Sequence, residues 1–265
     1  MSKLMDRLDR IAKGTNRSLG FAPSGNREPL PSMVLLAWWA GVDQKEIPLL
    51  LKAGADALVV PDSAVSKKGT EKQLSSVEGA NWGVHMEAYD SSHQETDQNK
   101  GCDFVVFGIE GTRVDVLAEG ERARVLRVPA DMPDSQLRGL EDLPVDIIIV
   151  RRPVPESPLS LVHLLAISNV RSATGRYLLL EWDAELTAAE LEQLRDIGVD
   201  GLVVCAGAAQ ASIVTVLRER INALPRRKPR GEKPSPILPR ATSVGGVRPR
   251  REEEEEEEEE EWDEP

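Results

Sequence analysis

Acidic residues recur just after the apolar segments of this chain. They are Asp62, Glu87, Glu110, Glu181 and Asp183. Carboxylates that converge on one site can divide into a general acid and a general base, because their surroundings push their pKa values apart. We predict this role for Asp62, Glu87, Glu110 and Asp183.

His85 and Glu87 lie two residues apart on one apolar segment, so a strand would turn both side chains to the same side. With Asp62 or Glu110 they are weak candidates for a metal site with nitrogen and oxygen ligands. The alternative is that they are polar groups at a rim, solvated or paired with arginines. No metal site is predicted, and no motif identifies a cofactor.

Two further features could bind an anion. Arg151 and Arg152 follow the apolar run 147–150, and an arginine fork suits a carboxylate or a phosphate. A salt bridge to one of the acids is the alternative. Gly207 and Ala208 precede an expected helix, whose first N–H groups could hold an anion. The expected substrate is therefore an anionic small molecule.

The tryptophans and the absence of some motifs give weaker information about the chemistry. Trp38, Trp39 and Trp182 stand near expected strand ends, where they could line a pocket or pack the rim. No lysine stands at the end of an expected strand, which weakens a Schiff-base mechanism. There is also no glycine-rich phosphate loop.

The elements that would position these residues follow a repeat of strand, helix and a Gly/Pro-x-Asp phrase that opens a second strand. Its four units begin at Val34, Gly83, Arg124 and Tyr177, with second strands over 54–60, 101–106, 144–150 and 198–204. Four units of two strands predict an α/β fold, a compact (β/α)8 TIM barrel. Any active site would then lie in the loops at the carboxyl ends of the strands. An open doubly wound sheet is the alternative.

The expected outer ring of helices is uneven. Residues 90–100 offer no apolar face, and residues 71–79 and 112–122 contain few apolar residues. A helix without an apolar stripe cannot cover a sheet by hydrophobic burial. We therefore expect thin or irregular helices after strands 2–4. Either loops cover this flank or a second subunit does, and we predict a homo-oligomer.

Three regions are expected along the chain. Residues 1–32 form an N-terminal helix, over about 4–13, and a lead-in segment, and this helix could plug the bottom of the barrel. Residues 33–224 form the barrel. Residues 225–265 are rich in Pro and Arg and then in glutamate, and we expect them to be disordered. This tail could be solubilising or could contact a basic partner.

Of the net charge of −12, residues 225–265 carry −4, from 9 basic and 13 acidic groups, which leaves −8 for the rest of the chain. This acidic body argues against nucleic-acid binding by the barrel, because binding to phosphates needs a positive surface. Cys102 and Cys205 are expected to be reduced thiols packed as small apolar groups. No signal peptide is recognised, and no apolar run approaches the length of about 20 residues that a membrane helix needs. We expect a cytoplasmic protein without a membrane segment.

The phrases Gly54-Ala55-Asp56 and Gly198-Val199-Asp200 resemble those of aldolase-type TIM barrels, over about 33–223. That group holds many phosphate-binding and flavin-dependent enzymes. The chain departs from its phosphate-binding members at 181–183, where Glu-Trp-Asp replaces a glycine-rich turn. The resemblance concerns the fold and names no reaction.

Two functions fit these observations. The first is a small-molecule enzyme of lyase or isomerase type, which uses the acids at the carboxyl ends of the strands. The alternative is a barrel without catalysis, an assembly or scaffold protein whose charged tail makes contacts.

Overall fold

The aspartate of each repeated phrase ties an even-numbered strand to the strand before it in the computed structural model. The N–H of Asp56 donates to the carbonyl of Leu35 at 2.7 Å, and its carboxylate accepts the N–H of Leu35 at 2.8 Å. Asp200 and Leu178 repeat this pair at 2.7 and 2.9 Å, and Asp146 and Arg124 repeat it at 2.9 and 2.8 Å. In three of the four phrases the sequence repeat is therefore a repeated side-chain contact. The fourth aspartate, Asp103, repeats the backbone bond, to the carbonyl of Trp82 at 2.8 Å, but its carboxylate binds helix α1.

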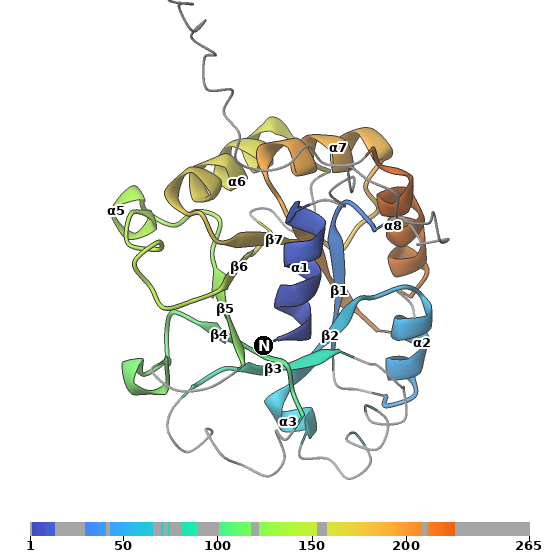
Figure 1. Cartoon of the computed structure of the whole chain (residues 1–265), viewed down its shortest axis with the longest axis horizontal. Helices are drawn as coiled ribbons and strands as arrows, with labels where there is room; N and C mark the ends of the chain where they lie inside the picture. The colour runs from blue at the N-terminus through green and yellow to red at the C-terminus, as the bar shows by residue number, and fades with distance from the viewer. Residues whose placement is uncertain are drawn as a thin grey trace, which may run out of the picture. The chain divides into compact units, whose positions relative to one another are not determined.

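Eight parallel strands close into a barrel (Figure 1). Their bounds are β1 Val34–Trp39, β2 Ala57–Pro61, β3 Trp82–Met86, β4 Phe104–Gly108, β5 Ala123–Val128, β6 Ile147–Val150, β7 Tyr177–Glu181 and β8 Gly201–Ala206. Strand β1 pairs with β8, with Leu36 opposite Val203. The predicted closed barrel is thus confirmed, and the open sheet is excluded.

The structure describes residues 2–13, 30–40, 43–65, 70, 74, 81–89, 101–117, 122–152, 158–207 and 211–225. Residues 1–230 form one unit, to which the barrel belongs. The expected disordered tail, 225–265, lies outside the described residues except for Pro225.

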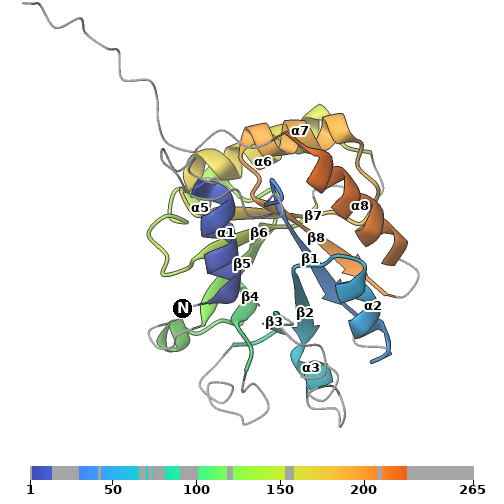
Figure 2. The same ribbon diagram turned by 45° about the vertical axis from the view of Figure 1, so that its right-hand side comes forward.

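The helices of the described residues differ strongly in length. They are α1 Lys3–Lys13, α2 Glu46–Lys52, α3 Asp62–Val65, the 3-10 helix η3 Val114–Leu117, α5 Asp134–Leu137, α6 Leu161–Ala173, α7 Ala188–Ile197 and α8 Ala211–Ala223. Helices α6, α7 and α8 follow one another along one side of the barrel (Figure 2). The expected thin cover is confirmed after strands 2 and 4 by the short α3 and η3, and the short α5 follows strand 5. Residues 90–100, after strand 3, lie outside the described residues.

The barrel interior is filled by alternate residues of the strands. Leu36, Val59, Val106 and Leu179 belong to this inner cluster. Glycine makes room for larger neighbours: a Cβ at Gly83 would lie 2.2 Å from the ring of Phe104. The interior is therefore a packed core, as in other barrels of this size.

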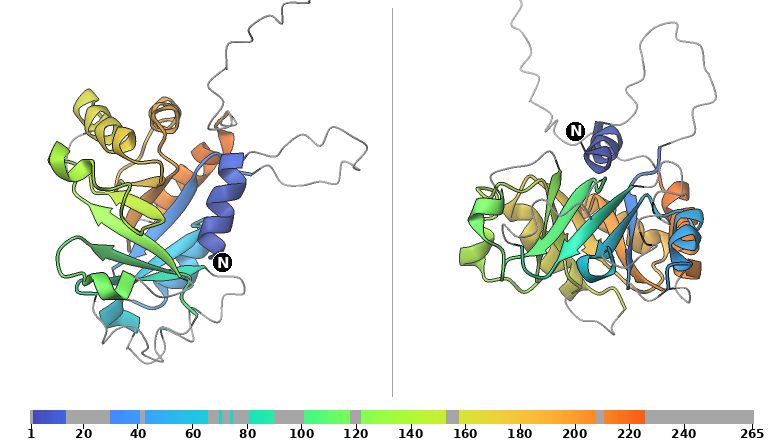
Figure 3. Two further views of the ribbon diagram at one scale, coloured as in Figure 1. Left: turned by 60° about the vertical axis from the view of Figure 1, so that its left-hand side comes forward. Right: turned by 90° about the horizontal axis from the view of Figure 1, so that it is seen from below.

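Helix α1 closes the amino-terminal end of the barrel, as Figure 3 shows in its right-hand view. Leu4, Leu8 and Ile11 are buried and belong to the inner cluster. The carboxylate of Asp103 caps this helix, because it accepts the N–H groups of Lys3 and Leu4 at 2.7 and 2.9 Å. The structure agrees with the expected plug.

Two further contacts hold α1 against Asp56, just before β2, and against β7. Arg7 pairs with Asp56 at 2.5 Å. The hydroxyl of Tyr177 donates to Asp9 at 2.5 Å, and this hydrogen bond lowers the pKa of Asp9. The helix is therefore joined to both halves of the barrel.

The amino-terminal ends of α7 and α2 differ in their capping. Thr187 caps α7 in a reciprocal capping box with Glu190, and Gly198 ends this helix at φ 110°. Asp43 does not cap α2, because its carboxylate accepts the N–H of Lys45 in a turn before the helix.

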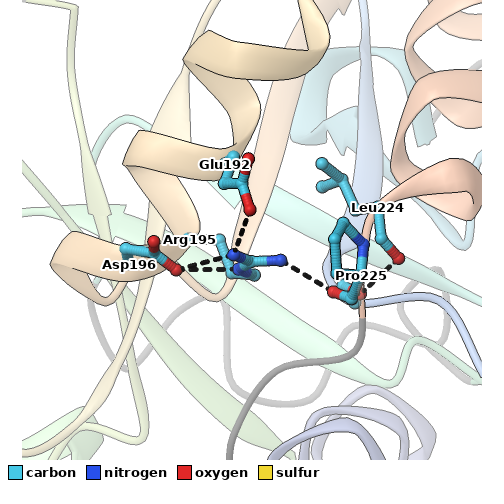
Figure 4. A network of polar contacts seen from close by, with 6 residues as sticks. Glu192, Arg195, Asp196, Leu224 and Pro225 are labelled. Atoms are coloured by element: carbon cyan, nitrogen blue, oxygen red, sulfur yellow. Dashed lines mark hydrogen bonds and ion pairs between the residues drawn. The ribbon is translucent and has the colours of Figure 1, made fainter.

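The residues that follow α8 are bound to α7 through Arg195 (Figure 4). Arg195 is buried and pairs with Glu192 and Asp196 on its own helix. It also donates to the carbonyl of Pro225 at 2.7 Å, and Ser32 donates to the same carbonyl at 3.0 Å. This network joins the residues before β1 to those after α8.

Candidate active site

The centre of the carboxyl end of the barrel is an ion pair between β5 and β7. Arg127 donates to both carboxylate oxygens of Glu181, with Nε–Oε1 at 2.5 Å and Nη2–Oε2 at 2.9 Å. Burial lowers the pKa of Arg127, but the hydrogen bonds and negative charge of Glu181 outweigh it, so the pKa is raised. The guanidinium is thus fixed in place and fully charged.

An aromatic pair lies against this guanidinium. Arg127 stands over the ring of Trp38, with its central carbon 4.9 Å from the ring centroid. The Trp38 ring contacts His85 at 4.6 Å between centroids. Burial and the charge of Arg127 lower the pKa of His85 to about 4, although Glu87 opposes this. His85 is therefore a neutral imidazole at pH 7.

Asp183 and Cys205 form the remaining edge of this cluster. The Asp183 carboxylate accepts the backbone N–H of Cys205 at 2.9 Å, and Cys205 is opposite Trp38 in the sheet register. The pKa of the Cys205 thiol is raised to about 12 by lost hydration and by the charges of Asp183 and Glu181. Cys205 is exposed, so the two carboxylates are the firmer cause.

The polar cluster begins where the apolar interior ends. One step below Arg127 and Glu181, the inward positions of the same strands are Val125 and Leu179. Gly108 pairs with Arg127 in the register, and among the described residues a Cβ built there would meet only a carbonyl oxygen, at 3.9 Å. As far as these residues show, the mouth is open beside Arg127 on the β4 side.

The four acids predicted as catalytic do not form one cluster. Asp183 belongs to the Arg127–Glu181 group, and the charge of Glu87 reaches His85. Asp62 begins helix α3, and Glu110 is exposed in the turn after β4. The structure thus brings Glu87 and Asp183 to the rim around the central pair.

Arg151 and Arg152, the predicted anion-binding fork, lie in different surroundings. Arg151 is exposed, whereas Arg152 stacks on the ring of Trp182 at 4.1 Å. Successive residues of an extended segment point to opposite sides, so adjacent arginines diverge. Gly207 is half-buried after β8, and Ala208 lies outside the described residues.

The tryptophans divide in the same way. Trp38 faces the mouth, but Trp39 and Trp182 are buried in the outer layer between strands and helices. Trp39 also belongs to β1 rather than to the loop after it, and its indole donates to Glu46 at 2.9 Å. Of the two alternatives, packing therefore applies to Trp39 and Trp182, and only Trp38 is placed to line a pocket.

Sequence reasoning missed Arg127. The one signal in the sequence was its position. Arg127 lies two residues after the inward Val125, near the end of the strand 123–128, so its side chain also points inward. Cys205 was expected to be packed like Cys102. Both thiols are free, but only Cys102 is buried.

In the described part of the chain, no group of three or more His, Cys, Asp or Glu side chains is arranged to hold a metal ion. His85 and Glu87 therefore lack such a third ligand among these residues. None of the described helices has the length and apolar character to traverse a lipid bilayer.

Comparison with known proteins shows similarity of fold alone. No family model and no curated protein sequence matches the chain. A tryptophan synthase structure from M. tuberculosis has a TM-score of 0.55 at 13% identity, covering 83% of this chain and 99% of that one. The tryptophan synthase alpha-subunit of Pyrococcus furiosus gives 0.52 at 11%, covering 72% and 96%.

Orotidine 5'-monophosphate decarboxylase of Methanocaldococcus jannaschii gives a TM-score of 0.50 at 12% identity, covering 71% of this chain and 98% of that one. At such identities the likeness shows the TIM-barrel fold and not the reaction. The resemblance to aldolase-type barrels is confirmed at this level.

Proposed function

We propose that the protein is a small-molecule enzyme of lyase or isomerase type that works at the carboxyl end of its barrel. The observation that carries this proposal is the Arg127–Glu181 pair, set directly above an apolar interior. A buried ion pair is weak evidence for stability, because desolvation offsets much of its attraction. Its place at the end of the strands favours a role in binding or catalysis.

In this proposal the groups divide their tasks. Arg127 supplies the fixed positive charge that would orient an anionic substrate or stabilise a developing negative charge. Glu87 and Asp183 stand at the rim as the acid and base groups. His85 is neutral at pH 7, and can therefore accept a proton or donate a hydrogen bond without carrying charge.

The test is a thermal-shift screen of carboxylated and phosphorylated metabolites against the full chain, followed by assays for turnover of each stabilising compound. We expect a stabilising compound whose turnover falls at least about a hundredfold in Asp183→Asn or Glu87→Gln, the range for loss of a general acid or base. Asp115→Asn, at an exposed pair with Arg113, is the control. Turnover that survives both rim variants would overturn the assignment of acid and base.

A specific observation also favours the assembly function. Helix α6 exposes Leu161, Val162 and Leu165 at 76%, 65% and 66%. Large apolar side chains gathered on one helix are typical of an interaction surface. The alternative proposal is a homo-oligomer in the cytoplasm with this helix at the contact. Light scattering of the full chain and of Leu165→Lys tests this proposal. We expect the mass of at least two chains for the natural protein and the mass of one chain for the variant.

A further inference from the structure

His163 is a buried imidazole whose tautomer is set by a backbone N–H group. It lies in the first turn of α6 and is 1% exposed. The N–H of Ser160 donates to its Nδ1 at 3.1 Å, and the Ser160 hydroxyl lies 2.7 Å from the same atom. A backbone N–H can only donate, so Nδ1 is the acceptor and the neutral ring carries its proton on Nε2.

Within the part of the chain that the structure describes, neither that Nε2–H group nor the indole N–H of Trp182 has a hydrogen-bond partner. Trp182 follows β7 and is also 1% exposed. The two rings meet edge to face, with centroids 5.3 Å apart. Buried donors are nearly always paired in folded proteins, so two neighbouring donors without acceptors indicate a missing acceptor.

Positive charge surrounds these two donors. The guanidinium of Arg152 lies 4.1 Å above the Trp182 ring. The amino-terminal end of the 13-residue helix α6, which carries His163, adds the positive end of its dipole. A water molecule could accept from the two N–H groups, but an oxyanion would in addition be attracted by the nearby guanidinium of Arg152 and by the helix dipole.

We propose that His163, Trp182 and Arg152 form a binding site for an oxyanion, either a carboxylate or a phosphate group. His163 Nε2–H and Trp182 Nε1–H donate to its oxygens, and Arg152 supplies the charge. The site is separate from the barrel mouth, because Trp182 belongs to the outer layer whereas its neighbour Glu181 pairs with Arg127. It does not depend on the proposed enzyme function, since a free ion would occupy it.

The indole of Trp39 provides an internal control for the test. It is fully buried like Trp182, but its N–H already donates to Glu46. The experiment is a titration of the full 15N-labelled chain with inorganic phosphate, and separately with acetate, at constant ionic strength. The indole N–H resonances are assigned by triple-resonance spectra. Acetate reports a carboxylate site and phosphate a phosphate site.

We expect the Trp182 indole resonance to move saturably with at least one of these ions, with half-saturation below about 10 mM, while that of Trp39 stays in place. Arg152→Gln should weaken this binding about tenfold or more, because charge-assisted hydrogen bonds are the strong ones. Arg151→Gln makes the same charge change one residue away, at an exposed side chain, and should leave the affinity within about twofold.

The inference is wrong if neither ion moves the Trp182 resonance, which would leave water as the acceptor. It is equally wrong if Trp39 and Trp182 shift in parallel, or if Arg151→Gln weakens binding as much as Arg152→Gln does.

Discussion

Arg127 and Glu181 bind each other through two hydrogen bonds, of 2.5 and 2.9 Å, at the carboxyl end of the barrel. The two residues come from β5 and β7, which are not neighbours in the sheet. Their side chains therefore meet across the interior and not along the sheet surface. This crossing pair fixes the geometry of the candidate site.

Breaking this pair from one side should destabilise the protein. Arg127→Met leaves the carboxylate of Glu181 without this ion-pair partner, and Glu181→Leu leaves the guanidinium of Arg127 without it. We expect each to lower the free energy of unfolding by about 2 kcal/mol, less than for a fully buried pair because Arg127 is half-buried. The double variant should lie within about 1 kcal/mol of the natural protein. Urea unfolding of all four proteins measures the coupling, and purely additive losses would contradict the paired geometry.

His85 should make stability depend on pH. Its pKa is about 4 in the folded chain and 6.5 in the unfolded chain, so the unfolded chain binds more protons between these values. Stability is full above about pH 6.5 and is lost as pH falls towards 4, by roughly 3 kcal/mol. His85→Gln should show a shallower loss over this window than the natural protein. Equal slopes in urea titrations at each pH would refute the shifted pKa.

Cys205 should be slow to alkylate despite its exposure. A pKa of about 12 leaves very little thiolate at pH 8, and the greater nucleophilicity of a more basic thiolate offsets only part of this loss. Labelling by iodoacetamide should therefore be on the order of tenfold to a hundredfold slower than in the unfolded chain. Asp183→Asn removes one of the charges that oppose the thiolate and should accelerate labelling. Peptide mass spectrometry separates Cys205 from Cys102. Native labelling at the unfolded rate would show that the carboxylates do not act on this thiol.

The Asp103 cap should hold helix α1 in place. Asp103→Ala removes the acceptor of two helix N–H groups, and we expect a loss of about 1–2 kcal/mol in the free energy of unfolding. Hydrogen exchange should rise over Lys3–Lys13. Asp115→Ala, at an exposed ion pair, is the matched control and should cost less than about 1 kcal/mol. If exchange in α1 is unchanged by Asp103→Ala, the cap is not what fastens the helix.

Most of the barrel could be predicted because its signals are local. Gly198 marks the end of α7 through its positive φ, and each Gly/Pro-x-Asp phrase opens a strand. The extent of the helices is harder to predict, since α5 spans only Asp134–Leu137. A single short turn has too little sequence to distinguish a helix from a series of turns.

The site was predicted less well, because it depends on contacts between distant strands. Acids near strand ends were easy to identify, but Glu181 could be separated from Glu110 only by its partner Arg127, 54 residues away. The direction of the Arg152 side chain likewise depends on its stacking against Trp182, and no spacing in the sequence predicts that contact. Side-chain direction at a strand end needs the exact end of the strand, and boundaries are the least certain part of a sequence-based prediction.

The most direct test of the central claim is to fill the open side of the barrel mouth. Gly108→Leu places a side chain beside Arg127 where a Cβ meets almost nothing, and Gly139→Leu makes the same change in a turn far from the mouth. A ligand at about a hundred times its Kd adds about 2.7 kcal/mol to stability. We predict that the thermal shift caused by the screened ligand is lost in Gly108→Leu and kept in Gly139→Leu. A full shift in Gly108→Leu would contradict a small-molecule site at the mouth of the barrel.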